Sequence, residues 1–124
     1  MKLRMKSNSI RIRVSQTELK EFRTGRSIEE EILMGPGQSL TYGLVQSETD
    51  RVKVNWSNSR LEIMVPEELA SMWCDTEIVG FDETVDLESG QELYVLVEKD
   101  FQCLKPRAED ESDLFANPEA IDPD

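Results

Sequence analysis

Alternation of apolar and polar residues with a period of two is the feature that most constrains the fold of this chain. Ile10, Ile12 and Val14 alternate with arginines, which gives the segment one apolar and one polar face. The same spacing recurs, between turn-forming residues, at Leu3 and Met5; Ile28, Ile32 and Met34; Leu40, Tyr42 and Leu44; Val52, Val54 and Trp56; Leu61, Ile63 and Val65; Ile78 to Phe81; and Leu93, Val95 and Val97. The pattern predicts about eight strands with short antiparallel connections, in a barrel or sandwich.

Two segments break the alternation and predict short helices. Residues 15–18 have the Ser-x-x-Glu form of a capping box and Gly25 suits a C-terminal stop, so we expect a helix over 16–24. Pro66 suits a first helical position and predicts a second helix over about 66–74. The side chains expected in the core on this basis are Leu69, Met72, Trp73 and, from a strand, Trp56.

The two halves of the chain resemble each other. Ser7-Asn8-Ser9 recurs 50 residues later as Ser57-Asn58-Ser59, and the strand that follows matches with a shift of one residue. Each half, 1–50 and 51–100, predicts two strands, a helix and two strands. We therefore expect one mainly β (α+β) domain over residues 1–104, with a pseudo-two-fold internal duplication as one interpretation. The other is that any two hairpins followed by a capped helix look this similar.

Charge is distributed unevenly along the chain. The formal net charge is −12, yet residues 1–26 hold eight basic and two acidic residues. Residues 105–124 are acidic and contain three prolines, which is typical of a mobile tail outside the core. We expect this tail to fold back over the basic segment, with Leu114 and Phe115 as its apolar anchor.

Composition excludes most common enzyme mechanisms. The chain has no His and two Cys, so the usual general base, the Cys-His and Ser-His pairs and the commonest zinc ligand are missing. We expect neither a cofactor nor a metal site. Since no run approaches the roughly 20 apolar residues of a membrane span, we also expect no membrane association and a cytoplasmic protein with reduced thiols.

Two resemblances are visible in the sequence. The opening Met-Lys-Leu-Arg-Met-Lys-Ser-Asn-Ser-Ile-Arg and the closing Glu-Lys-Asp-Phe-Gln-Cys-Leu of residues 98–104 resemble a family of small uncharacterised bacterial proteins, a domain of unknown function. This resemblance implies a bacterial cytosolic origin and offers no catalytic residue. The strand-Pro-Glu-Glu-Leu-helix-strand unit of residues 61–81 is similar to swapped-hairpin transcription factors of the AbrB type, but the acidic net charge argues against DNA binding.

Few residues could carry chemistry. Cys103, with Asp100 and Lys99 beside it, is the only candidate nucleophile, because nearby cations raise the thiolate fraction; its alternative is a small buried apolar residue. Cys74 is expected to be a packing residue. A cluster of carboxylates, Asp82, Glu83, Asp86 and Glu88, could in principle hold Ca²⁺ or Mg²⁺, but its spacing favours an ordinary hairpin with a Ser89-Gly90 turn.

The basic N-terminal hairpin is the most distinctive expected surface. Arg4, Lys6, Arg11 and Arg13 alternate with apolar residues and could bind an acidic protein or a phosphate-bearing ligand. Alternating cations also keep an exposed strand from pairing with other chains. The leading hypothesis is a non-catalytic interaction or small-ligand-binding protein. Its alternatives are a small enzyme or redox protein using Cys103 and, less favoured, a nucleic-acid-associated barrel.

Overall fold

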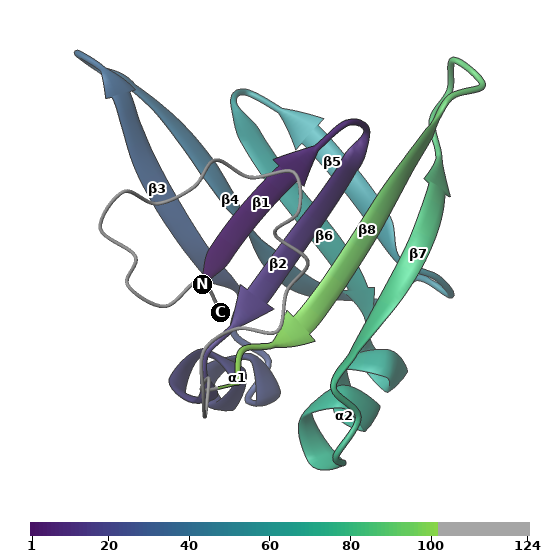
Figure 1. The fold of residues 1–124 in the computed structure, drawn as a ribbon. Coiled ribbons are helices and arrows are strands. Elements are labelled where there is room, and N and C mark those ends of the chain that lie inside the picture. Colours follow the sequence, from purple (N-terminus) through teal and green to yellow (C-terminus); the bar gives the residue numbers. More distant parts are fainter. Residues whose placement is uncertain (102–124) are drawn as a thin grey trace, which may run out of the picture.

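The structure, a computed structural model, describes residues 1–101 and has two four-stranded sheets and two helices (Figure 1). The helices agree with the sequence prediction to within one residue at each end. The elements are β1 (Lys2–Lys6), β2 (Ser9–Val14), α1 (Gln16–Arg23), β3 (Ile28–Gly35), β4 (Gln38–Ser47), β5 (Lys53–Ser57), β6 (Arg60–Pro66), α2 (Glu67–Asp75), β7 (Gly80–Asp86) and β8 (Glu92–Lys99).

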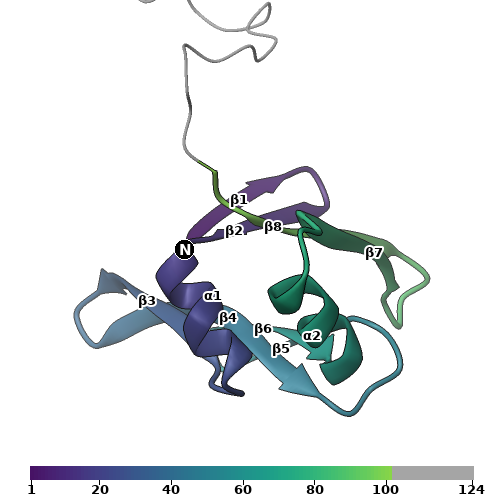
Figure 2. The ribbon, with the colours of Figure 1, turned by 90° about the horizontal axis from the view of Figure 1, so that it is seen from below.

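The two sheets face each other as a sandwich and do not close into a barrel (Figures 1 and 2). Sheet A has the strand order β1-β2-β8-β7 and sheet B the order β3-β4-β6-β5. Both helices connect one sheet to the other at the same end of the sandwich and contact each other there. At the other end, which we call the open end, the hairpin tips spread apart.

The short antiparallel connections expected from the sequence are present, but both sheets are mixed. The four hairpins are antiparallel, but β2 runs parallel to β8 and β4 runs parallel to β6. The reason is that each helix carries the chain into the opposite layer. Every sheet is therefore assembled from one hairpin of each half of the chain.

Strand pairing is equivalent in the two halves. Exchanging β1, β2, β3 and β4 with β5, β6, β7 and β8 converts the order of sheet A into that of sheet B. The register of the first hairpins fixes the matching positions, because Leu3 faces Ile12 as Val54 faces Ile63. Equivalent residues of these hairpins are thus 51 positions apart, so the Ser-Asn-Ser motifs at a separation of 50 are out of register by one.

Local signals explain the ends of α1. The Ser15 hydroxyl accepts a hydrogen bond from the Glu18 backbone N–H, and the Glu18 carboxylate accepts one from the Ser15 backbone N–H, which completes the predicted capping box. Gly25 follows the helix with a φ of +96°, where a left-handed residue allows its N–H to reach the Phe22 carbonyl. Pro66, at the matching position before α2, supplies no side-chain cap.

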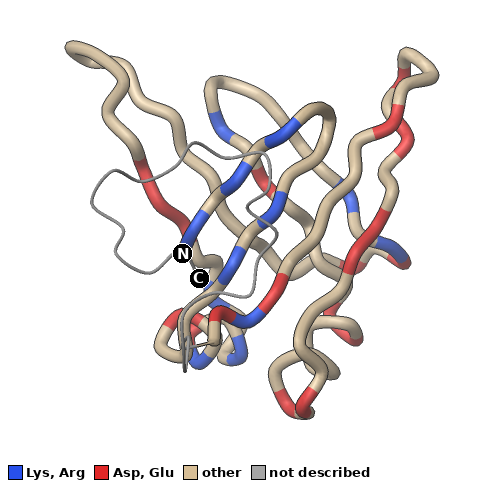
Figure 3. The backbone as a smooth tube through the Cα atoms, in the orientation of Figure 1, with Lys and Arg blue, Asp and Glu red and all other residues tan. Residues whose placement is uncertain are grey.

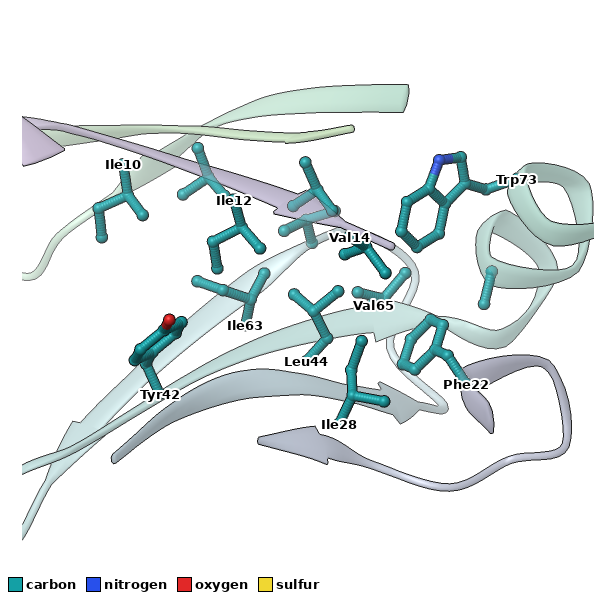
Figure 4. Close-up of a cluster of buried hydrophobic side chains, with 14 of the residues drawn as sticks. Ile10, Ile12, Val14, Phe22, Ile28, Tyr42, Leu44, Ile63, Val65 and Trp73 are labelled. Atoms are coloured by element: carbon teal, nitrogen blue, oxygen red, sulfur yellow. The ribbon is translucent and has the colours of Figure 1, made fainter. Parts of the chain in front are cut away.

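The core fills the space between the sheets and is closed at the helix end by Trp73 (Figure 4). Its ring is fully buried and makes edge-to-face contacts with Phe22 and Phe81, with centroids 6.0 and 5.3 Å away. The indole N–H donates to the Val79 carbonyl at 2.9 Å. Strands β2 and β6 contribute every second residue to this core: Ile10, Ile12, Val14, Leu61, Ile63 and Val65.

Two predicted core residues are exposed. Met72 is 50% exposed because Ala70 and Trp73 define the buried face of α2, and Trp73 is the counterpart of Phe22. Trp56 is 60% exposed although it alternates with Val52 and Val54, because it lies at the end of β5 where the sheets have spread apart.

A buried hydroxyl joins β4 to the strand beside it. Tyr42 lies 3.2 Å from a Glu30 carboxylate oxygen, to which its hydroxyl can donate, and 3.4 Å from the Met1 carbonyl. Burial, followed by the negative charge of Glu30, raises the pKa of Tyr42 to about 12.

We expect Trp73→Ala to lower the free energy of unfolding by about 3–5 kcal/mol, as other large-to-small aromatic core changes do. Trp56→Ala is the matched control and should cost less than about 1 kcal/mol, since most of its side chain is already in water. Urea unfolding followed by circular dichroism measures both. Equal costs would contradict the assignment of the core.

The contribution of Tyr42 to the free energy of unfolding should be measurable at alkaline pH. Its folded pKa of about 12 exceeds the ordinary value of 10.0, so between these values the folded state holds a proton that the unfolded state has lost. The free energy of unfolding must therefore fall as the pH rises through this window. Tyr42→Phe should reduce that slope, measured by urea unfolding at several pH values; an unchanged slope would contradict the shift.

Candidate functional site

The candidate binding surface is the outer side of β1 and β2, which we call the basic face (Figure 3). Leu3, Ile10 and Ile12 turn inward, so strand alternation places the intervening residues on the outside. All four cations predicted from the sequence meet here, joined by Lys2. The basic face comprises Lys2, Arg4, Lys6, Arg11 and Arg13.

Like charges lie directly opposite each other on this surface. The antiparallel register places Arg4 across from Arg11 and Lys2 across from Arg13. Directly opposed residues of like sign destabilise a sheet. The hairpin therefore carries a repulsion that an anion on its surface would relieve.

Acidic neighbours neutralise the basic face only in part. Glu98 of β8 accepts hydrogen bonds from Arg11 at 2.7 Å and lies 3.7 Å from the Nε of Arg13. Within residues 1–101, Arg4 and Lys6 have no carboxylate within 4 Å. Lys2 pairs with Asp100 at 2.9 Å, so among the described residues the uncompensated positive charge lies at Arg4 and Lys6, toward the β1–β2 turn.

The equivalent surface of sheet B, on β5 and β6, shows whether the fold itself requires the cations of the basic face. The hairpin β5–β6 has the same register as β1–β2. Its outward positions carry two basic residues and one acidic residue, whereas those of β1–β2 carry five basic residues. The equivalents of Arg4, Arg11 and Arg13 are Asn55, Glu62 and Met64. Because the same hairpin forms without the cations, the fold does not require them.

The family comparison confirms the expectation of a domain of unknown function. A family of unknown function (DUF7009) matches residues 1–119. The chain belongs to this family. No curated protein and no solved structure matches the chain.

Asp100, the first of the two catalytic candidates, has a structural partner. Its carboxylate lies 2.9 Å from the Lys2 ammonium, and this hydrogen bond lowers the pKa of Asp100 below its ordinary value. The Asp100 backbone N–H donates to the Val14 carbonyl. Asp100 therefore joins the segment after β8 to β1 and β2.

Cys103, the second candidate, lies outside the described residues, and so do the acidic tail of residues 105–124 and its proposed anchor. The domain boundary at 104 lies there as well. The enzyme hypothesis and the masking of the basic face by the tail stay predictions.

Cys74 lies half-buried in α2 with its sulfur 4.0 Å from the Leu19 carbonyl. Burial, assisted by the neighbouring Asp75, raises the pKa of the Cys74 thiol. At neutral pH the thiol form is favoured, which is the opposite of an activated nucleophile.

The carboxylates near the β7–β8 hairpin do not converge. Asp82 accepts a hydrogen bond from Tyr94 at 2.7 Å, and Glu83, on the other face of β7, pairs with Arg51 at 2.8 Å. In the described part of the chain, no three Asp, Glu, Cys or His side chains are placed to hold a metal ion. Gly90 has a φ of +83° in the turn predicted there.

An apolar groove of about 900 Å³, which the sequence did not predict, lies at the open end. It lies between the β5 edge and the β7–β8 hairpin, and its apolar lining includes Met5, Val54, Trp56, Leu61, Val85 and Leu93. The signal was present in the alternation, but pattern alone does not show where facing sheets separate. None of the helices within residues 1–101 has the length and apolar character needed to span a bilayer.

The reactivity of Cys74 is a direct check on its environment. In a Cys103→Ser variant, we expect a thiol reagent at neutral pH to label Cys74 at least about tenfold more slowly in the folded than in the urea-unfolded protein, because burial limits both access and ionisation. Equal rates would contradict the half-buried placement.

Proposed function

We propose that the protein is a non-catalytic interaction protein that binds an anionic partner through its basic face. The observation that carries this proposal is the set of opposed cations on β1 and β2, which the equivalent hairpin of sheet B does without. A bacterial, cytoplasmic setting, expected from the sequence, is part of the same proposal.

The basic face suits a ligand with several oxygens. Arginine guanidinium groups present a planar set of N–H donors that matches carboxylate and phosphate geometry. Arg4 and Lys6 are exposed, so they can reach such oxygens without breaking an ion pair to a described residue. Binding would replace repulsion between neighbouring cations with attraction to a shared anion.

A short anionic segment fits this surface better than a long nucleic acid. The chain carries −12 overall, and on the same side of sheet A the basic face gives way to acidic residues, Glu98 and Asp82. A long polyanion extending beyond β2 would be repelled there. A few carboxylates on a partner protein, or a few phosphates on a ligand, would not.

The proposal predicts a charge-specific loss of binding. Arg4→Gln with Lys6→Gln should reduce low-salt affinity for short polyphosphate or an oligoglutamate peptide several-fold and lessen its salt dependence, because each lost contact removes a screened attraction. Isothermal titration calorimetry measures both ligands, and the ligand that binds more tightly identifies the partner chemistry.

Lys20→Gln with Lys53→Gln is the matched control. It removes the same net charge from exposed positions outside the basic face, and its affinity should stay near that of the unaltered protein. Equal losses in the two double variants would show that only net charge matters. Duplex DNA binding more tightly than either short ligand would favour the nucleic-acid alternative.

A further inference from the structure

The tip of the β3–β4 hairpin exposes large apolar side chains to water. Leu33 is 78% exposed and Met34 is 67% exposed, and Ile32 precedes them. The strand register shifts between Leu33 and Gly35, so Met34 is left out of the ladder and two neighbouring apolar residues reach solvent. Contiguous exposed apolar surface of this kind marks interaction sites.

The fold does not require an apolar residue at position 33. The β7–β8 hairpin is the equivalent of β3–β4. Leu33 pairs with Ser39 in β3–β4, and Asp86 pairs with Glu92 at the same position of β7–β8. Leu33 therefore corresponds to Asp86, and the tip that follows reads Leu-Glu-Ser-Gly in place of Met-Gly-Pro-Gly. The residue before the turn is therefore apolar in one half, Leu33, and acidic in the other, Asp86, whereas the next residue is apolar in both, Met34 and Leu87.

The apolar groove opens at the same end of the molecule as this tip. Its lining includes Asn8 at the β1–β2 turn and Leu87 at the β7–β8 turn, and all four hairpin tips lie away from the helices (Figure 1). The β3–β4 tip and the groove lie on opposite sides of the open end. Trp56 and Met5, 60% and 55% exposed, line the groove.

We propose that two copies of this chain associate through their open ends, with the β3–β4 tip of each seated in the apolar groove of the other. In each copy the tip and the groove lie on opposite sides of the open end. A two-fold axis between two open ends therefore places the tip of each copy over the groove of the other. The two contacts are then identical and the assembly closes as a dimer.

Size favours a second copy as the occupant. A groove of about 900 Å³ can accept two or three apolar side chains, which is what the tip offers. A stable dimer buries about 800 Å² on each partner, which favours a contact that engages both the tip and the groove of each copy. A reciprocal contact covers both surfaces at once.

Charge argues against an anionic lipid surface as the occupant of this site. The strand that leads to the tip carries Glu29, Glu30 and Glu31, and anionic headgroups would repel it. The groove rim has both signs, with Arg51 and Lys53 beside Asp86 and Glu88, so apolar burial is the main attraction. Since each copy carries −12, added salt should strengthen the dimer by screening repulsion, whereas it weakens binding at the basic face.

Sedimentation equilibrium of the full chain tests the dimer over roughly 1 μM to 1 mM. We expect a concentration-dependent dimer that tightens with salt, and Leu33→Asp with Met34→Asp should shift its dissociation constant at least tenfold toward monomer. Asp already stands at position 86, the equivalent of Leu33, and Met34 is mostly in water, so folding should be retained, as circular dichroism will show. Met72→Glu, at the exposed surface of α2, is the control and should leave the dimer unchanged.

A mixing experiment tests which surfaces meet. Trp56→Asp in the groove should weaken the dimer as the tip variant does, and an equimolar mixture of the two variants should regain dimer, because one copy keeps an intact tip and the other an intact groove. Acrylamide quenching should report protection of Trp56 on dimerisation.

Three results would overturn the proposal. The first is a protein that stays monomeric at all concentrations, and the second is a dimer that the tip variant leaves intact. The third is a monomer that sediments with neutral lipid vesicles and loses this binding in the tip variant. None of them bears on anion binding by Arg4 and Lys6, so the two proposals fail separately.

Discussion

Parallel pairing between hairpins from the two halves of the chain is the constraint on which the rest of the structure depends. Neither half of the chain forms a four-stranded sheet alone, because the central pairs β2–β8 and β4–β6 each join a strand of one half to a strand of the other. The helices make this exchange possible by carrying the chain between layers, and Phe22 and Trp73 pack against each other where the helices meet. Loss of that contact would loosen both layers together, since each helix connects one sheet to the other.

The equivalence of the halves separates what the fold needs from what its surfaces carry. Ile12 and Ile63 occupy matching buried positions, as packing between the sheets demands. Outward and terminal positions are free to differ, and they do so where Arg4 corresponds to Asn55 and where Leu33 corresponds to Asp86. Differences between positions of equal structural role cannot be explained by folding, which makes them the best available indication of function.

Strands and helix ends could be predicted because their signals are local. Alternation gave β2 and β6, and the capping box at Ser15 gave α1. The parallel pairs could not be predicted, because the local sequence of a hairpin does not show which distant hairpin it pairs with. Trp56 was misplaced for the same reason: alternation shows which face of a strand a residue occupies, but not whether another sheet covers that face. Of the candidate site, the basic face was predictable from charge, and the groove was not.

The two proposed surfaces use opposite sides of one strand. In β1, Met5 turns inward to line the groove while Arg4 and Lys6 turn outward on the basic face. Contact through the open ends would therefore leave the basic face of each copy uncovered, and a dimer would present two of them. A partner with two acidic segments could then bind both, the second at an effective concentration set by the link between the segments. Because screening by salt strengthens the one contact and weakens the other, such avidity would be greatest at intermediate ionic strength.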